Sequence, residues 1–208
     1  ALDSAFKEGF ELPDKFKFYE APGVAETPDF PIYMSGFAGA FNYGDSSPVK
    51  PNSPLMLWFA AKFGKPQYAW YFLHMREQAD KEPLPATRTD VFSILWYDSR
   101  FRELSASFPL DRAYMQDTGP NLVLMRSSWH DPDGIYVGLK GGYNLESHSA
   151  LSNGTFVLDA LGERWATMRG PGSYQWPGYF DRTRGRYLYY NNRAEGQNTL
   201  VMNPDSGR

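Results

Sequence analysis

The spacing of apolar residues changes near Ser105, and this change limits the chain to a fold with helices first and a sheet second. Before this point, helical patterns occur in three runs, at 55–63, 67–79 and 91–98. From Leu110 onward, short runs rich in β-branched and aromatic residues alternate with Gly, Asp and Asn, as in an antiparallel sheet. We therefore expect an α+β fold, with a loop-rich and helical segment at 1–105 and an antiparallel β segment at 106–208.

Proline and glycine mark where the helical part begins. Six prolines interrupt residues 1–52, so long regular elements are not expected there. Ser53 and Pro54 predict the start of a helix over 55–63, because Ser caps the first N–H groups of a helix and Pro is tolerated in its first turn. Gly64 is suited to end that helix, since glycine readily adopts a left-handed conformation.

Two more helices and six strands are predicted. Helices are expected at 67–79, where Tyr68, Tyr71, Phe72 and Met75 form one apolar face, and at 91–98. Strands are expected at 122–128, 135–139, 155–160, 164–167, 187–190 and 198–202. Turns are predicted at 131–134, where Pro presets one dihedral and Gly permits a positive one, and at 161–163.

Composition excludes several functions. Of the 208 residues, 42% are hydrophobic and 22% are charged, as in ordinary globular proteins. The net charge of −3 and the absence of a basic run remove the footprint of a nucleic-acid binder. No apolar run approaches the roughly 20 residues that span a membrane. Phosphate loops, nucleophile elbows and His-Glu-x-x-His helices are absent, which argues against nucleotide, esterase and zincin chemistry.

An ordered series of motifs stands between residues 141 and 200. It reads Gly-Gly-Tyr-Asn at 141–144, His-Ser-Ala-Leu-Ser-Asn-Gly at 148–154, Gly-Glu-Arg-Trp at 162–165 and Glu-Gly-Gln-Asn-Thr-Leu at 195–200. The series resembles the heparinase II/III-like family of polysaccharide lyases, whose pattern is Gly-Gly-x-Asn, His-Ser-His-x-Asp-x-Gly, Gly-x-Arg-Trp-x-x-Asp and Glu-Gly-His-Asn-Thr-Leu. The first half of the chain resembles the family only loosely, through Phe-Asn-Tyr-Gly-Asp at 41–45 and the helix after it.

The resemblance implies an architecture and a location. In this family an (α/α) toroid is followed by an antiparallel β-sandwich, so 1–105 would be the end of the toroid and 106–208 part of the sandwich. Family members are several times longer, and this chain starts without Met, so we expect a piece of a longer protein. A periplasmic or secreted bacterial location is expected by resemblance, although the chain shows no signal peptide.

The resemblance also implies β-elimination on glycans that contain uronic acid, such as glycosaminoglycans or alginate. The proton on C5, alpha to the carboxylate, is removed, and the bond to the C4 oxygen breaks. The enzyme must therefore neutralise the carboxylate, hold a base against C5 and protonate the leaving oxygen. The expected partner is an acidic polysaccharide or oligosaccharide, and the sequence indicates no oligomeric state.

Three residues are candidates for proton transfer. His148 matches the first His of the family's motif, and imidazole, with a pKa of about 6.5, suits a proton carrier. A lone His in a Ser-rich loop is otherwise a surface or hydrogen-bonded residue. Tyr174 and Tyr179 would protonate the leaving oxygen or, with a pKa lowered by nearby arginines, act as a base. Sheet packing is the alternative for both tyrosines.

Four residues are candidates for substrate binding. Asn144 and Arg193 would meet the uronate carboxylate, although an Asn beside a Gly pair is equally a turn former. Trp176 would offer its flat face to a sugar ring. Gln197 stands where the family has a His and would form hydrogen bonds, with substrate or within the sandwich.

The positions of the family's zinc ligands are altered. Ala150, Met168 and Gln197 stand where the family has His or Asp, and Ser152 replaces a further Asp. Ala has no donor atom, a thioether suits zinc poorly, and Gln is a weak neutral ligand. The chain also has no Cys. We therefore expect no zinc and no other cofactor.

Two other interpretations remain open. The altered ligand positions also fit a non-catalytic module that binds an acidic glycan through Trp176, Tyr179 and nearby arginines, with an affinity that salt weakens. Alternatively, the chain is a scaffold piece whose function is carried by other segments. Binding without turnover distinguishes the first of these from a lyase.

Overall fold

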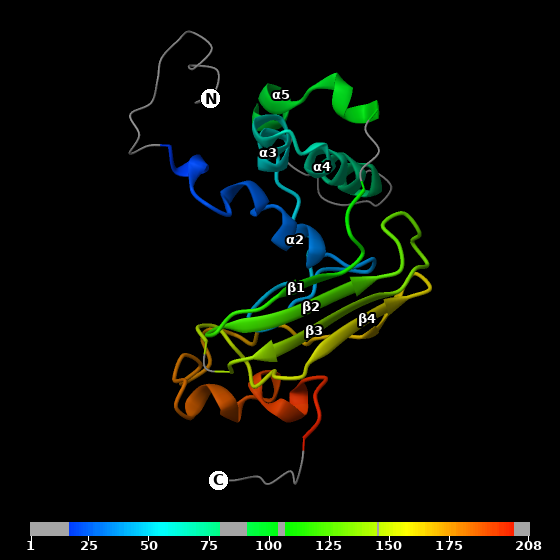
Figure 1. The fold of residues 1–208 in the computed structure, drawn as a ribbon. Helices are drawn as coiled ribbons and strands as arrows, with labels where there is room; N and C mark the ends of the chain where they lie inside the picture. Colours follow the sequence, from blue (N-terminus) through cyan, green and yellow to red (C-terminus); the bar gives the residue numbers. More distant parts are fainter. Residues whose placement is uncertain (1–16, 80–90, 104–106, 145, 202–208) are drawn as a thin grey trace. The chain divides into compact units, whose positions relative to one another are not determined.

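The computed structural model describes residues 17–79, 91–103, 107–144 and 146–201. These residues combine helices with a five-stranded antiparallel sheet, so the fold is α+β, as the change of apolar spacing predicts (Figure 1). The chain divides into two compact units, the first from Ala1–Ile32 and Pro51–Phe108 and the second from Tyr33–Lys50 and Pro109–Arg208. The sheet unit therefore includes a segment from the first half of the chain.

The two longest helices form where the sequence predicts them, as α3 (Leu55–Phe63) and α4 (Pro66–Ala79). Ser53 Oγ accepts a hydrogen bond from a first-turn N–H at 3.3 Å, as a capping serine should, although the helix is formally capped by Pro54. α3 ends at Gly64, whose φ of 62° is left-handed. The apolar face predicted for α4 is buried at Tyr68, Tyr71 and Phe72 and half-buried at Met75.

The third predicted helix, α5 (Val91–Trp96), stops before the expected end of the run at residue 98. Asp98 accepts a hydrogen bond from the N–H of Arg100 at 2.9 Å, which starts a separate 3-10 turn, η4 (Ser99–Glu103). No helix within the described ranges has the length and apolar character needed to cross a membrane. The shorter helices earlier in the chain are η2 (Phe18–Glu20), η3 (Val24–Glu26) and α2 (Asp29–Tyr33).

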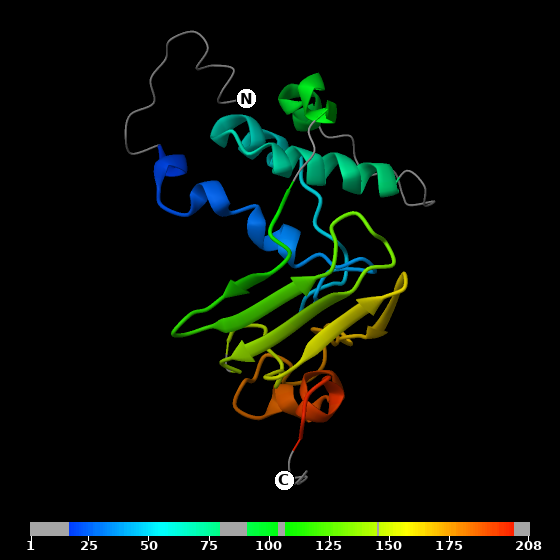
Figure 2. The ribbon, with the colours of Figure 1, turned by 45° about the vertical axis from the view of Figure 1, so that its right-hand side comes forward.

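The five strands pair in sequence order, each antiparallel to its neighbour (Figures 1 and 2). They are β1 (Arg112–Tyr114), β2 (Pro120–Arg126), β3 (Tyr136–Gly142), β4 (Phe156–Ala160) and β5 (Glu163–Ala166). Four of them match predicted runs with shifted ends. β1 lies outside those runs, because three residues are too few to show an alternating pattern.

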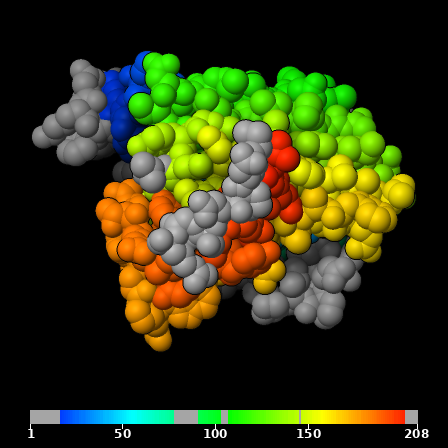
Figure 3. Space-filling view, turned by 90° about the horizontal axis from the view of Figure 1, so that it is seen from below, coloured from blue at the N-terminus to red at the C-terminus, as the bar shows by residue number. Residues whose placement is uncertain are grey.

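Two predicted strands, at 187–190 and 198–202, are wrong within the described residues. Residues 198–201 form no strand, and residue 202 lies outside the described ranges. The aromatic run at 187–190 falls instead within a series of 3-10 helices, because the Asn192 side chain is buried and donates to the carbonyl of Arg186 at 3.3 Å. These helices, orange to red in Figure 3, are η5 (Gly185–Leu188), η6 (Tyr190–Asn192) and η7 (Ala194–Gly196).

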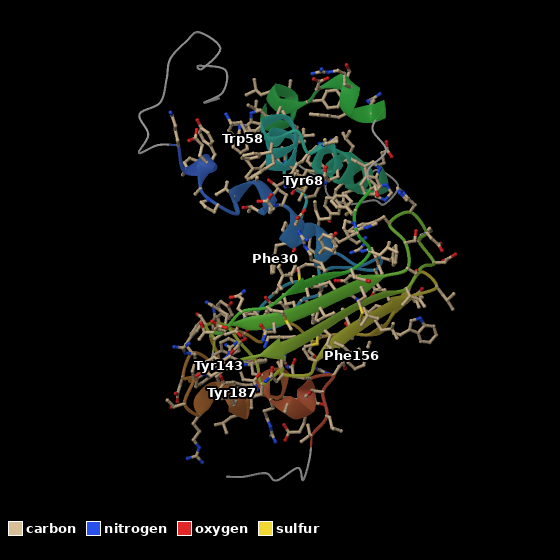
Figure 4. All side chains as sticks on the ribbon, viewed as in Figure 1. Phe30, Trp58, Tyr68, Tyr143, Phe156 and Tyr187 are labelled. Carbon is tan, nitrogen blue, oxygen red and sulfur yellow. The ribbon has the colours of Figure 1, made fainter. Side chains whose placement is uncertain are left out.

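The two faces of the sheet differ in burial and charge. Residues along β2 and β3 alternate between buried and more exposed positions, which places Arg126 and Lys140 on the buried face. The opposite face is apolar but partly exposed, and Phe156 marks it in Figure 4. Charged side chains on a buried face need polar partners. Arg126 finds them in another segment of the chain, since its Nη2 donates to the carbonyls of Tyr33 at 3.3 Å and Ser35 at 3.0 Å.

That segment is Tyr33–Lys50, which is bound to the buried face by side chains of the sheet. Arg164 donates to the carbonyls of Gly39 at 2.7 Å and Ala40 at 2.9 Å, and it also pairs with the buried Asp159 at 2.6 Å. These bonds pair buried charges with each other and with backbone groups. The result is a fixed path for the segment, and this path determines where Asp45 lies.

Candidate functional site

A buried carboxylate, that of Asp45, is the centre of a polar cluster in the sheet unit. Its side chain is 2% exposed. Oδ1 accepts hydrogen bonds from Tyr179 Oη and from Arg186 Nη2, each at 2.7 Å. Oδ2 lies 3.1 Å from Nδ1 of His148. The cluster therefore joins one acid, one guanidinium, one imidazole and one phenol.

The backbone holds Asp45 and His148 together independently of their side chains. The N–H of Asp45 donates to the carbonyl of His148 at 3.0 Å. Gly44 makes this approach possible, since its φ is 65° and a Cβ there would lie 2.7 Å from the same carbonyl oxygen. His148 itself has a φ of 59°, which is uncommon for a residue with a side chain. Such strain at a polar cluster is often found at functional sites.

Arg186 provides the positive charge of the cluster. Its side chain is 1% exposed, and its Nε donates to the carbonyl of Ser149 at 2.6 Å. The guanidinium also lies over the ring of Tyr179, 4.6 Å from the ring centroid. Because Arg186 is anchored at several points, it is built to hold Asp45 as an anion and is too buried to meet a substrate directly.

The two candidate tyrosines lie in this cluster but differ in exposure. Tyr179 is 1% exposed, and its hydroxyl donates to Asp45 while accepting the N–H of Gly172 at 3.0 Å. Tyr174 is 49% exposed, and its hydroxyl lies 3.3 Å from Nδ1 of His148. Tyr174 is therefore accessible to a ligand, whereas the hydroxyl of Tyr179 is engaged inside the protein.

The pKa of the acid and the pKa values of the two phenols are shifted in opposite directions. Burial alone would raise the pKa of Asp45, but hydrogen bonds from Arg186 and Tyr179 and the charge of Arg186 outweigh it and hold the pKa below its usual value. Burial raises the pKa of both Tyr174 and Tyr179, and the negative charge of Asp45 raises it further. Arg186 does lower both pKa values, but burial and Asp45 outweigh it, so the net shift is upward and not the lowering that nearby arginines were expected to cause.

The accessible part of the cluster can carry out acid–base chemistry. The side chain of His148 is 54% exposed and sits beside the hydroxyl of Tyr174. An imidazole can accept a proton near neutral pH, and a phenol with a raised pKa stays protonated and can donate one. The pair therefore offers a base and an acid on one surface.

Asn144 and Arg193 have other partners. Asn144 Oδ1 accepts the N–H of Asn153 at 3.0 Å, which supports the turn that precedes β4. Arg193 pairs with Glu195 at 2.5 Å. Within the described residues, the structure does not bring either side chain into contact with Asp45 or its partners.

Trp176 and Gln197 lie at different depths. Trp176 is 39% exposed and stacks on Tyr189, with ring centroids 4.8 Å apart, so one face of the indole is taken by protein. Gln197 Nε2 donates to the carbonyl of Asn191 at 2.5 Å. Its Oε1 is buried and has no hydrogen-bond partner among the described residues. Gln197 thus acts within the fold and Trp176 at its surface.

The positions expected to hold zinc in the family carry neutral side chains. Ala150 and Ser152 are buried, and Ser152 Oγ donates to the carbonyl of Ala150 at 3.3 Å. The sulfur of Met168 accepts the hydroxyl of Thr155 at 2.8 Å. Across the described ranges, no three His, Asp or Glu side chains come together as a metal site. The methyl group of Ala150 has no donor atom, and the hydroxyl and thioether groups at the other positions do not fit a zinc ion.

Sequence patterns singled out His148, Tyr174 and Tyr179, which the structure brings together in this cluster, but not Asp45 or Arg186. Asp45 lies 103 residues before His148, and only its place in the Phe-Asn-Tyr-Gly-Asp stretch pointed to it. Arg186 was one of several arginines near the aromatic run, with no pattern to single it out. Neither a family model nor a curated protein matches this chain.

Proposed function

We propose that the protein cleaves glycans containing uronic acid by β-elimination. The observation that supports this most directly is the exposed pair of His148 and Tyr174, whose polar atoms lie 3.3 Å apart beside the buried Asp45. Elimination needs a base at C5 and an acid at the leaving oxygen, and this pair supplies both. The ordered motif series at 141–200 supports the same reaction through its resemblance to heparinase II/III-like lyases.

Each residue has a defined role in this reaction. His148 takes the proton from C5, and the electrons of the C5–H bond form a double bond between C4 and C5. The C4–O bond breaks, and Tyr174 donates its hydroxyl proton to the leaving oxygen. The products are an unsaturated uronate and a new hydroxyl end, and His148 and Tyr174 then exchange protons with solvent to restore the starting state.

Substrate binding is assigned to the residues that the motif series suggests. Arg193 would neutralise the uronate carboxylate after leaving Glu195, with which it forms a partly exposed ion pair. Asn144 would add an amide donor, and the exposed part of Trp176 would stack on a sugar ring. Gln197 would act by keeping the neighbouring backbone in place. The substrate class is an acidic polysaccharide or oligosaccharide such as alginate or a glycosaminoglycan.

The wider architecture belongs to the same proposal. The helices would be the end of an (α/α) toroid and the five-stranded sheet part of a β-sandwich, in a periplasmic or secreted protein. The motif series supports this arrangement, and so does the partly exposed apolar face of the sheet, which resembles the inner face of a sandwich.

The direct test is a screen of uronate polymers. The protein would be incubated with alginate, hyaluronan, chondroitin sulfate and heparin, and the unsaturated product would be followed by its ultraviolet absorbance. We expect product with at least one polymer and none with His148→Gln. Absence of product with all of them, from folded protein, would reject the proposal.

A non-catalytic glycan-binding module is the second candidate, and a specific observation favours it. Tyr174, Trp176 and Phe180 are 49%, 39% and 57% exposed within one aromatic cluster, and exposed aromatic rings suit sugar binding without any chemistry. This function predicts binding of the same polymers that weakens with salt and is lost in Trp176→Ala, with no product formed.

A further inference from the structure

We propose that Asp45 is a positioning residue, which holds His148 in the tautomer protonated on Nδ1 and leaves Nε2 as the basic nitrogen that faces the substrate. This inference deepens the proposed lyase function and rests on it for its catalytic consequence. Its structural part, the tautomer of one histidine, can be measured without any substrate.

Asp45 is held in its charged form. Its carboxylate receives Tyr179 Oη and Arg186 Nη2 on a single oxygen, each at 2.7 Å. Both groups are donors, and Arg186 is a cation that never deprotonates in a protein. A carboxylate held by two donors and a buried guanidinium is an anion, and its second oxygen is left to meet His148.

The second step concerns the nitrogen that faces this oxygen. Nδ1 of His148 lies 3.1 Å from Oδ2 of Asp45 and 3.3 Å from the hydroxyl of Tyr174. A neutral imidazole carries its proton on one nitrogen only. If Nδ1 carries the proton, it donates to an anion, and a hydrogen bond of that kind is roughly twice as strong as one between neutral groups. If Nδ1 is bare, its lone pair faces a carboxylate, and only the more distant Tyr174 can donate to it.

The third step is catalytic. With the proton on Nδ1, the lone pair of the ring lies on Nε2, at the opposite edge from Asp45. The side chain of His148 is 54% exposed whereas that of Asp45 is 2% exposed, so the ring is open to a substrate although its partner is buried. The contacts to Asp45 and Tyr174 are both made at Nδ1, which leaves Nε2 for the substrate. Removal of the C5 proton by Nε2 creates an imidazolium, and the charge of Asp45 stabilises it.

The same geometry divides the two tyrosines. The hydroxyl of Tyr179 donates a hydrogen bond to Asp45 and accepts one from the N–H of Gly172. Its proton is therefore already bound to the carboxylate and is not free for a leaving oxygen. Tyr174 is the phenol whose hydroxyl lies near the accessible imidazole. Tyr174 is therefore the acid of the proposed reaction, and Tyr179 supports Asp45.

The variant Asp45→Asn tests the tautomer directly. Arg186 and Tyr179 both require an acceptor, so the amide oxygen of Asn would turn to them and its NH₂ group would face His148. A donor in that place favours a bare Nδ1 and moves the proton to Nε2. We expect nitrogen NMR of protein with labelled histidine to show Nδ1–H for neutral His148 in the wild type and Nε2–H in Asp45→Asn. The chain has three histidines, and His148→Gln identifies the signals of this one.

Two controls separate positioning from general damage. Asp98→Asn removes another acid that pairs with an arginine, Arg100, at 2.5 Å, and because this pair lies outside the segment that carries Asp45, the variant should leave the tautomer of His148 as in the wild type. Tyr174→Phe should also keep Nδ1–H, because Asp45 and not Tyr174 determines it. Wild-type His148 protonated on Nε2 would overturn the inference, and this measurement needs no variant. An unchanged tautomer in folded Asp45→Asn would overturn it as well.

Kinetics tests the catalytic part. On a polymer that the wild type cleaves, Asp45→Asn should lower kcat by roughly 10²–10⁴-fold, the contribution of a general base, with KM little changed. An unchanged kcat in a variant whose tautomer has moved would reject Nε2 as the base. Failure of the wild type to cleave any polymer would reject the proposed function alone, because the NMR result stands independently.

Discussion

Asp45 and His148 contact each other twice, once through the backbone, where the N–H of Asp45 donates to the carbonyl of His148 at 3.0 Å, and once through their side chains at 3.1 Å. Residues 103 positions apart are thereby fixed in one geometry. The double contact restrains the ring of His148 even though about half of its surface is open to solvent. An accessible but oriented imidazole is what proton transfer requires.

Replacement of Gly44 by any residue with a side chain should destabilise the fold because of this contact. A Cβ at Gly44 would lie 2.7 Å from the carbonyl oxygen of His148, and the φ of 65° is unfavourable for other residues. We expect Gly44→Ala to lower the free energy of unfolding by about 3 kcal/mol in chemical denaturation. Gly64→Ala is the matched control, since its φ is 62° but no atom lies within 4 Å, and it should cost about 1 kcal/mol. Equal losses in the two variants would show that the close approach contributes nothing.

Loss of the hydroxyl should affect mainly catalysis at Tyr174 and mainly stability at Tyr179. Tyr174→Phe removes an accessible acid, so kcat should fall by roughly 10²–10⁴-fold while the free energy of unfolding changes by less than about 0.5 kcal/mol. Tyr179→Phe leaves a buried acceptor on Asp45 with one donor fewer, so it should lower the free energy of unfolding by about 1–3 kcal/mol and reduce kcat less than Tyr174→Phe does. A larger kcat loss in Tyr179→Phe would reverse the assignment.

Acid should weaken the protein partly through Asp45. Its folded-state pKa lies below the ordinary value of 3.8, so its stabilising contribution is complete above that value and is lost as the pH falls through the folded pKa. We expect Asp45→Asn to be about 3 kcal/mol less stable than the wild type at neutral pH, because a buried ion pair loses one partner. In urea titrations the difference should shrink as the pH falls below 3.8 and through the lowered folded-state pKa. A difference that is constant with pH would mean that Asp45 is not charged in the folded protein.

Lys140 is a buried charge that the fold holds at a cost. It is 0% exposed, and its Nζ lies 3.5 Å from the carbonyl of Tyr143. Burial lowers its pKa, only partly opposed by Glu146. A lysine with a lowered folded pKa destabilises the protein below that pKa, and the free energy of unfolding rises as the pH increases from there toward 10.5.

Lys140→Met should therefore stabilise the protein at neutral pH by about 1–2 kcal/mol and remove this rise at alkaline pH. Lys65→Met serves as control, because Lys65 is in a partly exposed pair with Glu26 and its loss should change stability by no more than about 1 kcal/mol. Thermal and urea unfolding between neutral and alkaline pH would measure both. Destabilisation by Lys140→Met would show that the ammonium has a strong partner.

Local patterns predicted the elements better than the site. α3 and α4 were predictable because their caps and apolar faces lie within a few residues of each other. The aromatic run at 187–190 has the composition of a strand but forms 3-10 turns, because the buried Arg186 bonds both to Asn192 and to Ser149, which lies 37 residues away in the chain. Strand propensity measures packing on a pleated surface and cannot register such a partner.

The site shows the same division. Residue type and closeness in the sequence are enough to propose His148, Tyr174 and Tyr179 as one group, because all three can transfer protons and lie within one stretch. Asp45 reaches them only because Arg164 and Asp159 bind its segment to the sheet. The contacts that fix this path join residues more than 120 positions apart, so the local spacing of residue types cannot predict them.

The altered ligand positions should leave the protein without bound zinc. Ala150, Met168 and Gln197 provide no ligand set for it, so we expect elemental analysis to find no stoichiometric zinc and a chelator to leave the melting temperature unchanged. One tightly held zinc ion per chain would contradict this. The backbone can be tested with the triple variant Ala150→His, Met168→Asp and Gln197→His. If these positions lie as in the zinc-binding relatives that the motif series resembles, the variant should gain zinc-dependent stability, because a metal that binds only the folded state stabilises it by mass action. A folded triple variant that binds no zinc would show that the backbone departs from that arrangement.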